Sequence, residues 1–151
     1  MTITAYDSAM PQLIPASAPA VLPYGDGHNK WLHTRFPKAL YRYFTVTGDP
    51  ALDIADFEPG CIWPGSALRA WAEKRKTNHP EWDLTVYTDR DNFQAVVDSM
   101  QGFTWNLFLA TLDNTAPESY NGMKCRAVQY TDRSGAYDLS MIFDEDWLNK
   151  P

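Results

Sequence analysis

Segments with strand signals alternate with segments with helix signals along this chain, and that order constrains the fold more than any other feature. Runs rich in β-branched and aromatic residues predict strands at 2–6, 20–23, 40–46, 52–58, 84–87, 105–110, 126–130 and 137–143. Alternation of this kind favours a parallel sheet, open or closed, and about eight strands are enough to close a barrel whose own side chains fill it. The length of 151 residues fits one domain, 1–151.

Helical signals follow the early strands and are missing between the last three. Residues 28–36 carry a weak helical pattern that Pro37 ends. A second helix is predicted to start with Ser66 as its N-cap, and a third with Asp91 as its N-cap and Gln94 in the capping-box position. We therefore expect an α/β protein whose helices come mainly after the first strands.

The predicted strand at 52–58 ends with two carboxylates, Asp56 and Glu58, before Pro59 and Gly60 stop it. Side chains two residues apart on a strand point the same way, so we expect both acids to lie together at its carboxyl end. Two like charges held that close raise each other's pKa, a situation that general acid chemistry exploits. Taken alone, the pattern favours the plainer interpretation of a solvated rim.

Acidic residues also occur at the ends of other predicted strands, with Asp7 after the first strand and Asp138 in the last. In a barrel, the carboxyl ends of the strands form the functional face, so this recurrence strengthens the case for one shared site. The other polar or aromatic residues at or just past strand ends are Tyr87, Asp89, Gln129 and Tyr130.

The charge of the chain excludes some classes of partner. A net charge of −6 and a pI near 4.9 argue against nucleic acid, which requires clustered Lys and Arg. They also argue against an electrostatic membrane anchor, and no apolar stretch approaches the roughly 20 residues that span a bilayer. The first residues lack the basic and apolar regions of a signal peptide, so we expect synthesis in the cytoplasm.

The cysteines and histidines lack metal-type spacing, so the sequence predicts no metal and no cofactor. Cys61 and Cys125 are isolated, and they fit either two buried thiols or one disulfide. A weaker alternative function is a metal-dependent phosphodiester hydrolase. Its ligands would be Glu58, Asp56, Asp26 and His28.

Short motifs at the strand ends follow one another in a distinctive order. They are Ala5-Tyr6-Asp7, Asp56-Phe57-Glu58, Val86-Tyr87-Thr88, Leu107-Phe108-Leu109-Ala110, Gln129-Tyr130-Thr131 and a last run from Asp138 to Phe143. This order resembles that of the family 25 glycoside hydrolases, the Chalaropsis-type lysozymes common among phage endolysins. It is also similar to related glycoside-hydrolase-like domains of actinobacteria and their phages. The resemblance covers essentially the whole chain and implies a compact, irregular, TIM-like (β/α)5β3 barrel.

The same resemblance implies roles for individual residues. Glu58 would be the general acid that protonates the glycosidic oxygen, and Asp56 would stabilise the substrate's 2-acetamido group as that group acts as an internal nucleophile. Asp7 and Asp138 would line the sugar subsite and raise the pKa of Glu58 by like charge. Tyr87 would hydrogen-bond the substrate. The remaining expected substrate contacts are Tyr6, Asp89, Gln129 and Tyr130.

The leading functional hypothesis from sequence is a muramidase-type glycan hydrolase of phage origin that cuts the peptidoglycan backbone, either at a cell wall or within a phage particle. The compact length motivates an alternative, a catalytically silent barrel that serves as a sugar-binding or virion structural component. Contacts within a virion or between copies of the chain belong to that alternative. Both hypotheses require the scattered acids to meet at one end of a barrel.

Overall fold

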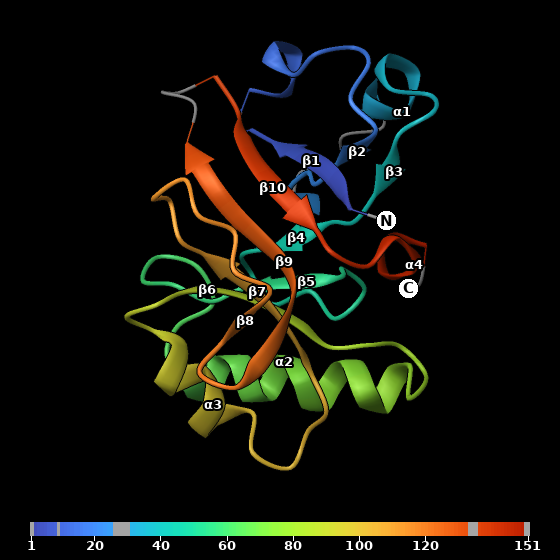
Figure 1. Cartoon of the computed structure of the whole chain (residues 1–151). Coiled ribbons are helices and arrows are strands. Elements are labelled where there is room, and N and C mark those ends of the chain that lie inside the picture. The colour runs from blue at the N-terminus through green and yellow to red at the C-terminus, as the bar shows by residue number, and fades with distance from the viewer. Residues whose placement is uncertain (1, 9, 26–30, 133–135, 150–151) are drawn as a thin grey trace.

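The computed structural model describes residues 2–8, 10–25, 31–132 and 136–149, and Figure 1 shows the arrangement of its elements. The strands are β1 (Ile3–Asp7), β2 (Ala20–Val21), β3 (Leu40–Tyr41), β4 (Phe44–Thr45), β5 (Ile54–Asp56), β6 (Thr85–Asp89), β7 (Asn106–Ala110), β8 (Ser119–Tyr120), β9 (Met123–Asp132) and β10 (Asp138–Ile142). The helices are α1 (Trp31–Arg35), α2 (Gly65–Asn78), α3 (Phe93–Ser99) and α4 (Glu145–Leu148).

The strands form one curled sheet in the order β3-β2-β1-β10-β9-β7-β6-β5-β4, with β8 paired beside β9. A single bridge brings the two sides of this sheet together. Tyr24, just after β2, pairs with Phe44 of β4, and the Phe44 amide donates to the carbonyl oxygen of Pro23 at 2.9 Å. The sheet is thus an irregular barrel from which β3 stands aside. The α/β barrel expected from the sequence is confirmed.

The strand directions differ from an all-parallel barrel at one place. β10 runs antiparallel to both of its neighbours, β1 and β9, whereas the ladders from β4 through β7 to β9 are parallel. The first residue of β10 therefore lies at the same end as the last residue of β1, and Asp138 pairs in register with Asp7. A strand with reversed direction puts its amino end at the functional face.

The strand predicted at 40–46 is wrong, because the structure divides it into β3 and β4, which pair with different neighbours. The break falls at Arg42 and Tyr43. Arg42 is buried and forms a two-bond ion pair with Asp83, while the Tyr43 carbonyl accepts the amides of Asp53 and Ile54. The buried guanidinium replaces the strand pairing that a continuous segment would have made.

Two predicted helix starts are also wrong. α2 begins at Gly65 after the N-cap Pro64, one residue before the predicted cap Ser66. Residue 65 packs closely on α3, where an added Cβ would meet Ser99 Oγ at 2.0 Å. α3 begins at Phe93 after the N-cap Asn92. The carboxylate of Asp89 accepts the Asn92 amide at 2.8 Å and so holds the turn that leads into α3, whereas no side chain of the described residues caps the helix itself.

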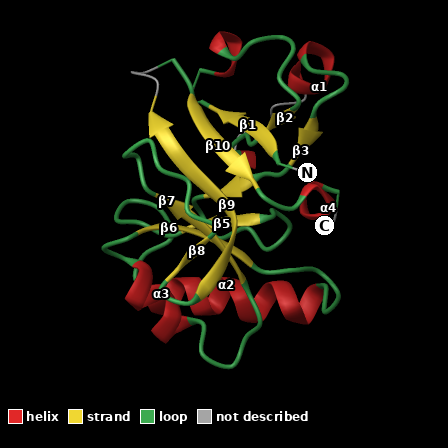
Figure 2. Ribbon diagram, viewed as in Figure 1, coloured by secondary structure: helices red, strands yellow, loops and turns green. Residues whose placement is uncertain are grey.

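Two layers of apolar side chains hold the barrel together. Inside it, Phe44, Ile54 and Phe108 form the core, and Trp147 of α4 closes the end formed by the amino ends of the parallel strands. Outside it, α2 and α3 lie on one side of the sheet, as Figure 2 shows, and Trp71 packs there with residues of β5 and β6. None of the described helices is long and apolar enough to cross a membrane.

Candidate active site

Asp7 and Asp138 face each other across β1 and β10. They lie at the end of the barrel that is formed by the carboxyl ends of the parallel strands. We call this the acid end, and it also carries Asp56 and Glu58. Asp7 is only 4% exposed, because inward-facing residues alternate along β1 and place it above Ala5 of the core. Burial raises the pKa of Asp7 well above its usual range, and the charge of Asp138 and a hydrogen bond to it add to the rise. Asp7 therefore keeps its proton and donates it to Asp138.

Asp56 is the most buried acid of the cluster, with 1% of its surface exposed at the end of β5. Burial, and then the charge of Glu58, raise its pKa to about 7, while a hydrogen bond with Cys61 acts in the opposite direction. Its Oδ1 atom has no hydrogen-bond partner among the described residues. A carboxyl group that titrates near neutrality and has a free oxygen is available for chemistry or for a ligand.

Glu58 lies just past the end of β5, beside Asp56 and partly exposed. A tight turn follows it, in which the Cys61 amide donates to the Glu58 carbonyl oxygen and the Ile62 amide to the Asp56 carbonyl oxygen, both at 3.0 Å. Gly60 allows the turn through its φ of +96°. One carboxylate oxygen from each acid and the Cys61 Sγ thereby lie within 4.8 Å of one another.

Two tyrosines complete the acid end. Tyr24 and Tyr87 both pack against the Phe44 ring, Tyr24 stacked and Tyr87 edge to face, with centroid distances of 5.4 and 5.5 Å. Burial raises the pKa of both phenols far above their usual range, and the charges of Asp56, Asp7 and Glu58 raise them further. Both hydroxyl groups stay protonated, so they act as neutral hydrogen-bond donors beside the acids.

The acids of this end lack positive partners. Among the described residues, five ion pairs occur, and none includes Asp7, Asp56, Glu58 or Asp138. Carboxyl groups held close together in a partly buried place share protons rather than ionise together, and acid–base catalysis uses this arrangement.

Neither a protein-family model nor a curated protein matches this sequence. Solved structures do match it over nearly its whole length. A GH25 lysozyme from Aspergillus fumigatus aligns at a TM-score of 0.64 and 14% identity, over 95% of this chain and 95% of that chain. A muramidase from Acremonium alcalophilum aligns at 0.59 and 14%, over 97% and 96%. The catalytic domain of an endolysin from a Listeria monocytogenes bacteriophage aligns at 0.55 and 10%, over 99% and 96%. This chain has the GH25 lysozyme fold.

Within that GH25-like fold, the structure brings together six of the predicted site residues. They are Asp7, Asp56, Glu58, Tyr87, Gln129 and Asp138. Gln129 is 6% exposed and lies opposite Ser140 on β10, where its side chain hydrogen-bonds Asp138. The alternation of inward and outward side chains along β1, β5, β6 and β9 accounts for this convergence.

Three predicted substrate contacts lie elsewhere. Tyr6 is adjacent in sequence to the inward-facing Asp7, and Tyr130 to the inward-facing Gln129, so both tyrosines point outward. The Tyr6 ring packs against Tyr137 at a centroid distance of 5.4 Å. The Asp89 carboxylate is occupied by the Asn92 amide and side-chain nitrogen, at 2.8 and 3.1 Å. In the GH25-like barrel, Tyr6 and Tyr130 thus pack outside the sheet and Asp89 holds the turn before α3.

Sequence reasoning missed Tyr24 and Cys61. Tyr24 lies just past the predicted strand at 20–23, so its strand-end position was the available signal. Cys61 approaches the acids only through the turn at Gly60, and no spacing rule predicts that turn. Both cysteines are free thiols; Cys125 is buried as expected, whereas Cys61 is partly exposed. Asp26 and His28, named for a phosphodiesterase, lie outside the described residues.

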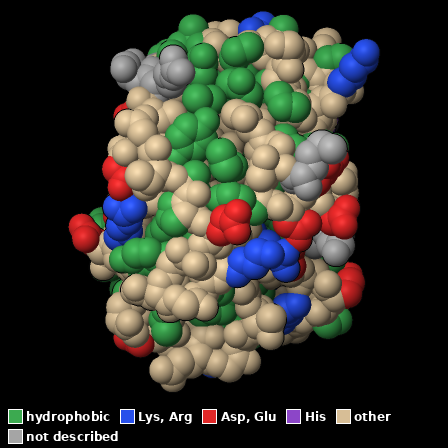
Figure 3. All heavy atoms as spheres, in the orientation of Figure 1, with side chains coloured by type: hydrophobic (Ala, Val, Ile, Leu, Met, Phe, Trp, Pro, Cys, Tyr) green, Lys and Arg blue, Asp and Glu red, His purple; other side chains and the backbone are tan. Residues whose placement is uncertain are grey.

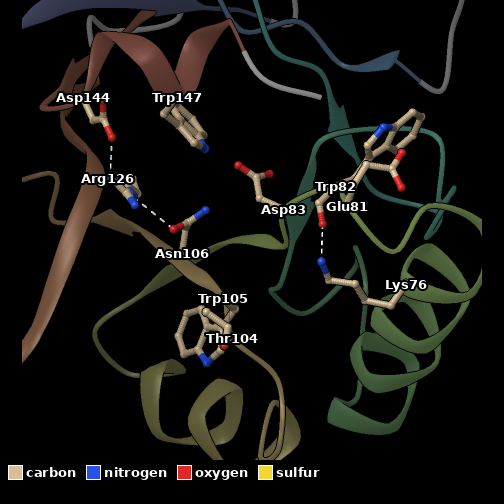
Figure 4. A pocket seen from close by; sticks show the side chains of 10 residues that line it. All are labelled: Lys76, Glu81, Trp82, Asp83, Thr104, Trp105, Asn106, Arg126, Asp144 and Trp147. Atoms are coloured by element: carbon tan, nitrogen blue, oxygen red, sulfur yellow. Dashed lines mark hydrogen bonds and ion pairs between the residues drawn. The ribbon is translucent and has the colours of Figure 1, made fainter.

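A pocket of about 280 Å³ lies at the opposite end of the barrel, and Figure 4 shows its lining side chains. Its basic groups have partners. Arg126 binds Asp144 and donates to Asn106 Oδ1 at 3.0 Å, while Lys76 donates to the carbonyl oxygen of Trp82. We call this the arginine end, defined by Arg42, Arg75 and Arg126, and the ion pairs that these arginines make with Asp83, Asp53 and Asp144 distinguish it from the acid end.

Proposed function

We propose that this protein hydrolyses the glycan backbone of peptidoglycan as a muramidase-type glycoside hydrolase. The observation that carries the proposal is the acid end, where four carboxyl groups meet beside two protonated tyrosines without a cation among the described residues. The names of the solved structures with this fold, a lysozyme, a muramidase and an endolysin domain, support the same substrate class.

In the proposed reaction Glu58 is the general acid. It is the more exposed member of the Asp56–Glu58 pair, so it can reach a glycosidic oxygen bound above the barrel. As the proton moves from Glu58 to that oxygen, the bond from C1 to the leaving sugar breaks. The carbonyl oxygen of the substrate's 2-acetamido group forms a new bond to C1, and water later replaces it while returning a proton to Glu58.

Asp56 supports this substrate-assisted step. Positive charge develops on the acetamido nitrogen as its carbonyl oxygen attacks, and the unpartnered Oδ1 of Asp56 can accept the N–H hydrogen bond. Tyr87 and Tyr24 donate to the acetamido group or to hydroxyl groups. Asp7 and Asp138, which share a proton, form the polar floor beneath the sugar.

The test is the clearing of purified bacterial cell walls, with reducing ends measured to identify the cleaved bond. Glu58→Gln should lower the rate by about 10²–10⁴-fold while leaving the fold intact. Glu81→Gln is the matched control, because Glu81 is exposed at the arginine end. Equal inertness of wild type and Glu58→Gln would overturn hydrolysis.

The same experiment separates hydrolysis from the silent-barrel alternative. A protein that binds chitooligosaccharides without cleaving them would support a sugar-binding role, and native mass spectrometry would then reveal whether copies associate. Whether the protein acts at a cell wall or in a phage particle is part of the proposal, and localisation by antibody labelling of particles tests it.

A further inference from the structure

Three different donor groups converge on one point of the acid end within a segment of six residues. Asp56 and Glu58 supply carboxylate oxygens and Cys61 supplies a sulfur, and all three donor atoms lie within 4.8 Å of one another. The turn that places them is fixed by the two backbone hydrogen bonds described above. The Cys61 thiol approaches Glu58 Oε1 at 3.7 Å.

A second observation indicates that this point can hold a ligand. Asp56 is 1% exposed, yet its Oδ1 has no hydrogen-bond partner among the described residues. A buried carboxylate oxygen without a partner is costly, and a bound cation satisfies it. Glu58 and Cys61 are partly exposed, so an ion can reach them and their side chains can rotate toward it.

The donor set selects among metals. Mg²⁺ and Ca²⁺ prefer oxygen ligands and would not use the sulfur. Zn²⁺ accepts thiolate and carboxylate ligands, with bonds of about 2.3 Å to sulfur and about 2.0–2.2 Å to oxygen, and often keeps one position for water when three protein groups bind it. The donor atoms already lie within 4.8 Å of one another, so small rotations of the two partly exposed side chains, Glu58 and Cys61, would let all three atoms contact one ion.

We propose that Asp56, Glu58 and Cys61 form a binding site for Zn²⁺ or a similar thiophilic divalent cation, and that its occupation switches off the acid end. The thiol proton is released to solvent as the sulfur–metal bond forms, so no oxidant or reductant takes part. The ion also supplies the positive charge that these carboxylates lack. The inhibition rests on the proposed function, whereas the metal binding itself does not depend on it.

Cobalt absorption tests the site without any substrate. Co²⁺ added to the metal-free protein should give a thiolate-to-metal charge-transfer band, and Zn²⁺ should displace the Co²⁺ and remove the band at one ion per chain. Cys61→Ser should abolish the band and weaken Zn²⁺ binding by more than the about 10–100-fold that outer-shell partners contribute. Cys125→Ser is the matched control, since the buried Cys125 packs on the outer side of β9.

Hydrolysis assays then separate the two proposals. If the protein cleaves cell walls, Zn²⁺ should inhibit the wild type and a chelator should restore it. In Cys61→Ser, Zn²⁺ should no longer lower the rate relative to that variant's own rate without metal. A charge-transfer band in a protein without hydrolytic activity would support the metal site and overturn only the proposed hydrolysis. No band, or a band unchanged in Cys61→Ser, would overturn the metal site even in an active enzyme.

Discussion

The two ends of the barrel contain similar acids in opposite surroundings. At the arginine end, the buried Arg42 binds Asp83 through two hydrogen bonds of 2.9 and 3.1 Å, and Arg126 binds Asp144. At the acid end, neither Asp7 nor Asp56 has such a partner among the described residues. The difference between the ends lies in the placement of the arginines. On the face shown in Figure 3, acidic and basic side chains lie next to one another across the middle.

This contrast assigns stability to one end and chemistry to the other. Arg75 is fully buried, yet it donates to the carbonyl oxygens of Pro50, Leu52 and Asp83 and lies 3.6 Å from Asp53. Such networks fix loops to the barrel and leave little unsatisfied. At the other end, burial raises the pKa values of Asp7, Asp56 and Asp138, and no basic side chain among the described residues forms an ion pair with them to lower these values.

Arg42→Ala is expected to give the largest effect on stability. The substitution leaves Asp83 without its guanidinium and removes the donor to the Trp147 carbonyl oxygen at 2.8 Å. Loss of one partner of a buried pair costs about 3–5 kcal/mol of the free energy of unfolding. Denaturant unfolding measures it, and a loss under about 1 kcal/mol, the range of an exposed pair, would remove the arginine end from its assigned role.

Asp56→Asn should raise the free energy of unfolding at alkaline pH, opposite to the loss expected for Arg42→Ala. The pKa of folded Asp56 is about 7 against 3.8 for the ordinary group, so between these values the folded protein binds more protons than the unfolded chain. The free energy of unfolding therefore falls as pH rises through this window. Asn should recover on the order of 2–4 kcal/mol at about pH 8 and little at about pH 4, while hydrolysis is lost. Unfolding curves at both pH values check this, and a gain independent of pH would contradict it.

Thr85→Val probes a neutral polar contact beside the arginine end. The Thr85 hydroxyl accepts the Trp147 indole N–H at 3.0 Å in the buried interior, and valine leaves that donor unpaired. We expect a loss of about 1–3 kcal/mol in the free energy of unfolding. Cell-wall hydrolysis per folded molecule should not change. A variant with normal stability but lower hydrolysis would show that the two ends are coupled.

Arg90→Ala should have the smallest effect. Arg90 and Asp113 form an ion pair at 2.7 Å, but both side chains are about 40% exposed. Solvent screening leaves such a pair with little effect on the free energy of unfolding, and high salt reduces that effect further. Thermal unfolding at low and high salt measures it. A loss comparable to that of Arg42→Ala would show that burial does not explain the contrast between the pairs.

The sequence predicted the barrel and most of the acid end because strand alternation fixes which side chains point inward. Asp56 lies inward on β5 by that rule, and Tyr87 lies inward on β6. The same rule places the side chains of Tyr6 and Tyr130 on the outer face of the sheet. The prediction that they contact substrate came from treating every residue of a short motif as part of the site. Periodicity was informative wherever a strand was continuous.

Features that depend on long-range contacts could not be predicted. The buried Arg42 divides one strand-like run into two because its partners, Asp83 and Trp147, are distant in sequence. The reversed direction of β10 depends on the ladder with β1, which joins the two ends of the chain. Composition and local pattern contain no information on either pairing.

The bridge between Tyr24 and Phe44 has a consequence for ligands. It is the seam at which the ring of strands meets itself, and Tyr24 belongs both to that seam and to the acid end. A saccharide bound by Tyr24 on one side and by Asp56 of β5 on the other would bridge the two sides of the sheet that meet at this seam. Because the ligand binds only the closed barrel, its binding would raise the free energy of unfolding of the protein.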